Sequence, residues 1–181
     1  TGSKKESNFH VVDSEYRGLA ALDAVTAIVI AEGYATADTL SQALSCPVVA
    51  AFDSGNLLKV AQVLQNKYPQ KPIVIAGDDD LTQESINGKN PGKEKAMEAA
   101  QLVNGAVVLP IFAPGEQMSQ QLSDFNDLAN KSVLGIEAVK RQVGSVVEKV
   151  SQQAKQDSLL KLQAHIEPKQ QEIKQKRALI R

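Results

Sequence analysis

Acidic side chains follow three of the apolar segments in this sequence. Glu32 comes directly after one such segment, and the run Asp78-Asp79-Asp80 comes directly after another. Three adjacent carboxylates repel one another, which raises their pKa values and destabilises a fold unless a cation lies near them. Hard oxygen ligands of this kind suit Mg²⁺, which takes one or two carboxylates and completes its shell with water and phosphate. The sequence therefore predicts a site for Mg²⁺.

Two of the three aspartates are the better candidate ligands. In an extended chain that continues a strand, Asp78 and Asp80 point to the same side and Asp79 points to the other. We therefore predict Asp78 and Asp80 as the metal ligands. An aspartate triplet also occurs in plain turns, because Asp bonds to its own backbone. Glu32 could likewise interact with the first turn of a helix that begins near Thr36.

Five further residues are candidates for secondary roles near this site. Asp124 and Asp127 follow the fourth apolar segment after a loop and are possible additional acids. Lys89 and Lys93 lie near a predicted helix N-terminus, where backbone N–H groups favour phosphate. Asn56 follows another strand end and is a possible phosphate or nucleotide contact. The sequence contains no Walker pattern.

The elements that would position these residues alternate along the chain. Apolar runs without polar alternation predict strands that are buried on both faces, as in a parallel sheet covered by helices. The segments between them have apolar residues at helical spacing. The predicted fold is an α/β, Rossmann-like, mostly parallel four-stranded sheet flanked by helices, whose ligands bind at the carboxyl ends of the strands. The four predicted strands lie in residues 27–31, 47–52, 72–77 and 106–112.

Some expectations concern local structure outside these strands. Residues 9–12 are a candidate extra strand. The polar residues 81–90 and 115–123 predict two loops, the first of unusual length for a connection after a strand. An amphipathic helix begins after residue 131, and Pro168 is expected to interrupt it.

Charge divides the chain into an acidic body and a basic tail. The net charge is −1, but residues 1–130 carry 9 Lys/Arg against 16 Asp/Glu, and residues 131–181 carry 11 against 5. We predict a lead-in over residues 1–27, whose first three residues resemble a cloning scar, a central domain over residues 28–130, and a basic helical tail thereafter. Such a tail can bind phosphates, but it is also typical of solvated helices.

Composition excludes several classes of protein. A single cysteine excludes an intramolecular disulfide framework and a cysteine-rich zinc cluster, and it fits a reducing compartment. No apolar run is long enough for a membrane span, and no signal peptide is visible. The expected location is the cytoplasm.

The motifs together resemble the Toprim domain of plasmid- and phage-type, conjugation-associated DNA primases. The resemblance covers residues 8–147, and five segments carry it in order. They are IVIAEGYATA (28–37), VAAFDSGNL (49–57), VIAGDDD (74–80), NPGKEKA (90–96) and DFNDL (124–128).

The resemblance implies a metal-dependent nucleotidyltransferase that makes RNA primers on a single-stranded DNA template from nucleoside triphosphates. Glu32 would act as general acid/base or metal ligand, and Asp78 and Asp80 would hold Mg²⁺ or Mn²⁺. The resemblance also implies a bacterial protein in which this chain works with other domains of a larger parent. It does not separate a primase from a Toprim nuclease that uses the same carboxylates. A non-catalytic module that binds nucleic acid or a partner within a conjugation protein is a further alternative.

Overall fold

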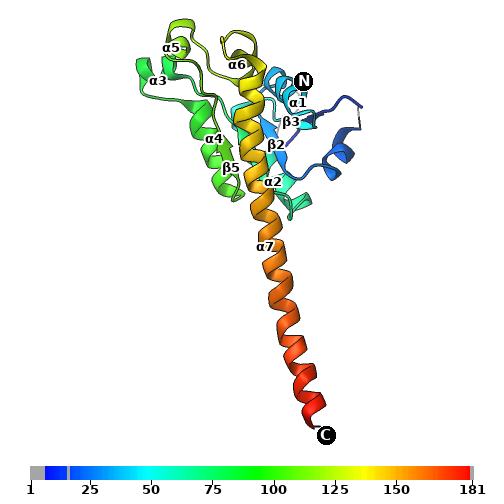
Figure 1. The fold of residues 1–181 in the computed structure, drawn as a ribbon. Helices are drawn as coiled ribbons and strands as arrows, with labels where there is room; N and C mark the ends of the chain where they lie inside the picture. The colour runs from blue at the N-terminus through cyan, green and yellow to red at the C-terminus, as the bar shows by residue number, and fades with distance from the viewer. Residues whose placement is uncertain (1–6, 16, 180–181) are drawn as a thin grey trace.

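The computed structural model describes residues 7–15 and 17–179, and at residue 165 and from residue 167 onward it describes the backbone alone. The expected cloning scar lies outside these residues. Figure 1 shows the arrangement of the elements. In chain order they are β1 (His10–Val12), the 3-10 helix η1 (Gly18–Asp23), β2 (Ile28–Ala31), α1 (Tyr34–Leu44), β3 (Val48–Ala50), α2 (Ser54–Lys67), β4 (Ile73–Ala76), α3 (Leu81–Asn87), α4 (Pro91–Leu102), β5 (Ala106–Val108), α5 (Glu116–Gln120), α6 (Phe125–Asn130) and α7 (Gly135–Leu179).

The described strands form one five-stranded sheet in the order β1-β3-β2-β4-β5. The four strands expected from the apolar runs are parallel to one another, as predicted. β1 extends the sheet at one edge and pairs antiparallel with β3, which confirms the extra strand candidate. In the centre, Ala31 of β2 lies opposite Ala76 of β4, so these two strands end at the same level of the sheet.

Helices cover both faces of the sheet, and alternate residues of each strand belong to opposite faces. Val29 and Ala31 of β2 pack with α1, α6 and the first turns of α7. Ile28 and Ile30 of the same strand pack with η1, α2 and α4. All four side chains are buried, which explains why the strand reads as a continuous apolar run.

The basic tail is a single helix, α7, and only its first half packs on the body. Val139 and Val143 are fully buried against the sheet. Farther along, Ser151 Oγ donates a hydrogen bond of 3.0 Å to Thr26 Oγ1, just before β2 begins. The helix thus crosses the sheet from the carboxyl to the amino ends of the strands and projects beyond them (Figure 1). Its far end lies on the side of the body opposite the carboxyl ends.

Three expectations about local structure are wrong. Pro168 does not interrupt α7, which continues through it to Leu179; a proline removes one hydrogen bond but an exposed helix can bend and continue. The polar residues 81–90 are largely the helix α3, and α5 occupies much of the second expected loop. Both helices are short and nearly without buried side chains, so neither has the apolar periodicity that predicts a helix.

Among the described residues, no helix is both long and apolar enough to cross a membrane.

Candidate metal centre

The predicted acidic residues meet where the connections of the sheet change direction. The chain leaves β2 through α1 on one face to reach β3, and it then returns through α2 on the other face to β4. The carboxyl ends of β2 and β4 therefore form the switch point of the sheet, the place where open α/β sheets bind their ligands. Glu32 follows β2 directly, and Asp78 follows β4 after one glycine.

Of the acids at this switch point, Asp78 has the pKa that is shifted most clearly. Its Oδ1 is buried, and no hydrogen-bond donor among the described residues reaches it. Burial, followed by the charges of Glu32, Asp124 and Asp127, raises the pKa of Asp78 to about 8. A buried carboxylate oxygen without a donor is costly, and a cation at this atom would remove both the desolvation and the repulsion.

Glu32 lies in the same electrostatic environment. Burial raises the pKa of Glu32, and the charges of Asp53 and Asp124 act in the same direction. A hydrogen bond from the backbone N–H of Ser54 opposes this shift. The fold therefore places two carboxylates of raised pKa, Glu32 and Asp78, at adjacent strand ends.

Gly92, in the first turn of α4, lies close to both Asp78 and Glu32. A Cβ built on Gly92 would lie 3.0 Å from Asp78 Cβ, 3.3 Å from the Asp78 carbonyl oxygen and 3.6 Å from Glu32 Oε2. The backbone of α4 can approach Asp78 and Glu32 this closely because Gly92 has no side chain. The partial positive charge of a helix N-terminus is thereby held beside two acids.

Asp124 and Asp127 lie at the N-terminus of α6, and their charges act on Asp78. Asp124 is the N-cap of α6, where its Oδ1 accepts the N–H of Asp127 at 2.7 Å and its Oδ2 accepts the hydroxyl of buried Thr36 at 3.1 Å. Asp127 accepts the N–H of Ser123 at 3.0 Å and pairs with Lys131 at 2.8 Å. Both acids contribute charge at Asp78 while their own oxygens are held in place.

The other two aspartates of the triplet have separate partners. β4 ends at Ala76, so the strand alternation that distinguished Asp78 and Asp80 from Asp79 does not extend into the triplet. Asp80 is the N-cap of α3 and accepts the N–H of Gln83 at 2.8 Å. It is not among the charges that act on Asp78. Asp79 points to α4, and the role of Asp80 as a ligand stays a prediction.

The three candidate phosphate contacts differ in their freedom to bind a ligand. Asn56 is buried, and its side chain bonds the backbone of Ser7, Asn8 and Ala51. Lys93 lies 3.5 Å from Asp79 and is also within ion-pairing reach of Glu84. Lys89 is exposed in the segment between α3 and α4. Of the three, Lys89 and Lys93 lie beside the N-terminus of α4, as the phosphate interpretation requires.

These residues fit an open metal site more closely than a closed one. Among the residues that the structure describes, no group of three or more His, Cys, Asp or Glu side chains is arranged so as to hold a metal ion by itself. Magnesium commonly binds through one or two carboxylates and keeps several waters or substrate phosphates. The donor-free oxygen of Asp78, with Glu32 beside it, provides that minimal set.

Two residues that lie beside the acids, Gly92 and Asn90, carry only weak signals in the sequence. Both lie within the segment NPGKEKA. A glycine directly after a proline in a helical first turn is a signal for close backbone approach. Asparagine before that proline is a typical N-cap, which Asn90 is. Neither signal says which acids the two residues contact.

We expect Gly92→Ala to weaken Mn²⁺ binding severalfold while the protein stays folded. The added methyl group would press on the backbone and Cβ of Asp78 at 3.0–3.3 Å and force them apart by a few tenths of an ångström. Isothermal titration calorimetry measures the affinity, and circular dichroism follows unfolding. Gly144→Ala on α7 is the control, because its Cβ would meet only Leu44 at the ordinary distance of 3.8 Å. Equal Mn²⁺ affinities in both variants would contradict the role of Gly92.

Comparison with known proteins identifies the family of this chain. The Toprim domain profile matches residues 27–133. Two relatives, each described as DNA primase TraC from Escherichia coli, are 39% identical to the chain over 210 and 232 aligned positions, which cover 85% and 97% of the chain. The chain spans only 14% and 22% of the lengths of these relatives. No solved structure matches the chain significantly. The family match covers more than half of the chain, and the chain belongs to the Toprim domain family, as a Toprim domain of the plasmid-type primases.

Proposed function

We propose that this chain is the metal-dependent catalytic part of a DNA primase, which joins nucleotides into RNA primers. The observation that carries the proposal is the donor-free, buried oxygen of Asp78 amid the charges of Glu32, Asp124 and Asp127. Groups with pKa values perturbed by burial and by named charges, at the ligand-binding edge of a sheet, are characteristic of functional sites. The similarity to DNA primase TraC supports the choice of reaction.

In this proposal Asp78 and Glu32 hold the ion, and Asp124, whose charge acts on both of them, is the next carboxylate beside it. To serve as a ligand, Asp80 would have to release the N–H of Gln83. A bound Mg²⁺ or Mn²⁺ would neutralise charge on the transferring phosphoryl group. Glu32 would accept the proton of the attacking hydroxyl at Oε2, the atom that faces Gly92. Burial raises the pKa of Glu32 toward neutral pH, which suits a group that must both take up and release a proton.

The N-terminus of α4 would receive the phosphates of the incoming nucleotide. Its first N–H belongs to Gly92, because Pro91 has none, and Gly92 lies beside Asp78. Lys89 and Lys93 add positive charge at the same end of the helix. A helix N-terminus favours anions through its dipole and its unpaired N–H groups. Lys93 is paired with Asp79 here and would have to leave that carboxylate to contact a phosphate.

The single-stranded template would be held mainly by other parts of the complete protein. Residues 1–130 contain 9 Lys/Arg against 16 Asp/Glu, whereas proteins that grip nucleic acid depend on clustered positive charge. The far end of the basic helix α7 projects from the opposite side of the body and does not adjoin the acids. The chain spans less than a quarter of the primases it matches, so the missing domains are the natural source of that grip.

The second candidate function is a nuclease, because the same carboxylates would also stabilise phosphodiester cleavage. A two-part assay separates the two reactions. The complete protein is given single-stranded template with nucleoside triphosphates and Mg²⁺ or Mn²⁺, and the 181-residue chain is given labelled DNA or RNA with the same ions. Metal-dependent primers without cleavage are expected. Cleavage without primer synthesis would replace the primase proposal by the nuclease, and neither product under any ion would remove both.

A further inference from the structure

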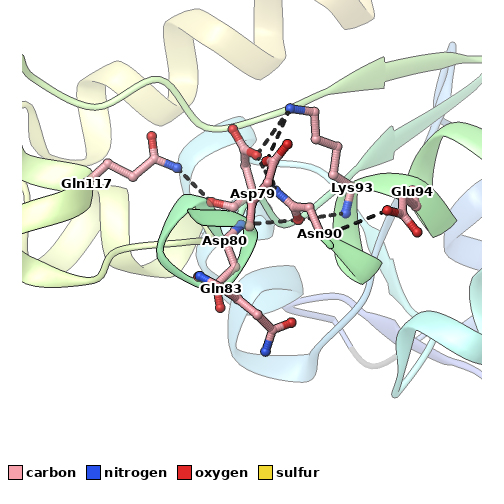
Figure 2. Close-up of polar contacts among 8 residues, drawn as sticks. Asp79, Asp80, Gln83, Asn90, Lys93, Glu94 and Gln117 are labelled. Carbon is pink, nitrogen blue, oxygen red and sulfur yellow. Dashed lines mark hydrogen bonds and ion pairs between the residues drawn. The ribbon is translucent and has the colours of Figure 1, made fainter. Parts of the chain in front are cut away.

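Asn90 is the buried centre of a partly exposed polar network beside the proposed metal site (Figure 2). Its side chain is almost wholly buried, with 3% of the residue exposed. The side-chain nitrogen Nδ2 donates to Asp79 Oδ1 at 2.8 Å and to Glu84 Oε2 at 3.0 Å. The side-chain oxygen accepts the backbone N–H groups of Asp80 at 3.3 Å and Lys93 at 3.4 Å. One amide group thus uses both of its donors and accepts two bonds.

Asp79, the middle aspartate of the triplet, is held from three directions. Its carboxylate accepts from Asn90 and pairs with Lys93 on α4. Its carbonyl oxygen accepts from Gln117 Nε2 on α5 at 2.6 Å, as Figure 2 shows. Its N–H donates to the carbonyl oxygen of Ser123, immediately before α6, at 2.7 Å. Asp79 therefore connects the segment that carries Asp78 to both neighbouring parts of the site.

These connections lie between the carboxylates that must converge. Asp78 precedes Asp79 in the chain, and Gly92, which contacts Asp78 and Glu32, comes two residues after Asn90. On the other side, Ser123 precedes Asp124, whose charge acts on both Asp78 and Glu32. The bonds of Asn90 and Asp79 thus fix three separate segments of the chain against one another at the site.

We propose that Asn90 is a positioning residue, which acts with Asp79 as a clamp that holds Asp78, Asp124 and the first turn of α4 at fixed separations beside Glu32. This inference rests on the proposed metal-dependent function and assigns Asp79 a role other than metal ligation. An ordinary N-cap needs only a side-chain acceptor, which Asp or Ser supplies as well as Asn. Here Nδ2 also donates one bond to each of two carboxylates and so holds them together. A side-chain amide provides two donors and an acceptor, whereas Ser has one donor and ionised Asp has none.

The test is Asn90→Asp in the 181-residue chain. The variant keeps the acceptor for the N-cap but loses both donated bonds and places a carboxylate against Asp79 and Glu84. We expect Mn²⁺ affinity, measured by isothermal titration calorimetry, to fall by about tenfold or more, as for other residues that orient metal ligands. If Asn90 acted only through local charge, the added carboxylate would tighten binding, so unchanged or tighter binding would overturn the proposal.

Two further variants distinguish a clamp from direct metal ligation by Asp79. Asp79→Asn is expected to stay within about threefold of the wild-type affinity, because its side-chain oxygen can still accept from Asn90; a loss as large as that of Asn90→Asp would make Asp79 a metal ligand. The double variant Asp79→Asn with Asn90→Asp restores the bond between positions 79 and 90 at the wild-type net charge, while position 90 still faces the carboxylate of Glu84. We expect it to bind Mn²⁺ more tightly than Asn90→Asp, and an affinity no higher than that of Asn90→Asp in a folded protein would contradict the clamp.

A matched control and a metal-free measurement complete the design. Asn126→Asp adds the same charge near Asp127, while its Oδ1 keeps accepting from Thr39 and Asn130. It should not weaken Mn²⁺ binding. Hydrogen–deuterium exchange in chelator should be faster in residues 78–80, 91–94 and 122–124 of Asn90→Asp than in the wild type. In the double variant Asp79→Asn with Asn90→Asp, the rates in these segments should return toward those of the wild type. If the wild type binds no metal, the proposed function fails, yet unchanged exchange in Asn90→Asp would still overturn the clamp by itself.

Discussion

Replacing Glu32 by glutamine in the complete protein is expected to lower primer synthesis by about 10²–10⁴-fold, the range for removing a general acid or base. Glutamine keeps the size of the side chain and an acceptor oxygen, but it cannot take up the proton of the attacking hydroxyl. The half-buried position of Glu32 and its proximity to Gly92 support a loss of reaction without loss of fold. The measurement is the initial rate of primer formation on single-stranded template at saturating nucleotide.

Glu98→Gln is the matched control for this variant. Glu98 lies on the exposed side of α4, where its carboxylate pairs with Lys95 at 2.7 Å. Exposed pairs of this kind contribute little to stability, and the site acids do not contact it. We expect normal primer synthesis from Glu98→Gln. Undiminished synthesis by Glu32→Gln would remove Glu32 from the reaction, whatever the behaviour of the other acids.

Asp78→Asn is expected to abolish measurable Mg²⁺ or Mn²⁺ binding and, in chelator at pH 8, to stabilise the fold by about 2 kcal/mol. Burial and the neighbouring acids raise the pKa of Asp78 from its usual 3.8 to about 8. Each pKa unit corresponds to about 1.4 kcal/mol. We expect only part of the full amount, because the carboxyl is partly exposed and water screens the charges around it.

The sign of this effect follows from proton linkage. Between pH 3.8 and about 8 the folded protein keeps a proton on Asp78 that the unfolded chain has lost. The free energy of unfolding of the metal-free protein therefore decreases as pH rises through this range. The destabilisation is absent below the lower value and complete above the upper one. Asp78→Asn should remove this contribution to the pH dependence, and Mg²⁺ should raise the melting temperature of the wild type but not of the variant.

Asp157→Asn provides the comparison, since Asp157 is exposed far along α7, where it accepts from Gln153. Chemical denaturation at several pH values, followed by circular dichroism, measures the free energy of unfolding. An Asp78→Asn protein that still binds Mn²⁺ with wild-type affinity would eliminate Asp78 as a ligand. A variant with the same stability profile as Asp157→Asn would show that the repulsion around Asp78 is absent in solution.

Sequence alone was informative about this fold because its strands are buried on both faces. Such strands read as continuous apolar runs, and the helices between them repeat at helical spacing. The same reasoning failed for α3 and α5, whose side chains are mostly exposed and have no apolar period. It failed at Pro168 because a single lost hydrogen bond does not end a long solvated helix.

For the candidate site, too, the sequence predicted some residue positions and could not predict others. Residue type and strand-end position identified Glu32 and Asp78 as acids at one edge of the sheet, since parallel strands end on the same side. Strand alternation could not place Asp79 and Asp80, because β4 ends before the triplet begins. Their partners lie on α3, α4 and α5, and no local pattern specifies such contacts.

The sequence by itself thus determined most of the element types, the sheet and the gathering of acidic residues at one edge of it, because these depend on local periodicity and side-chain chemistry. Only the tertiary structure decided which carboxylates face one another, how closely Gly92 approaches Asp78 and Glu32, and that Asn90 and Asp79 join the segments around them. The physical reason is that these contacts form between segments far apart in the chain. Their distances are set by how the helices pack on the sheet.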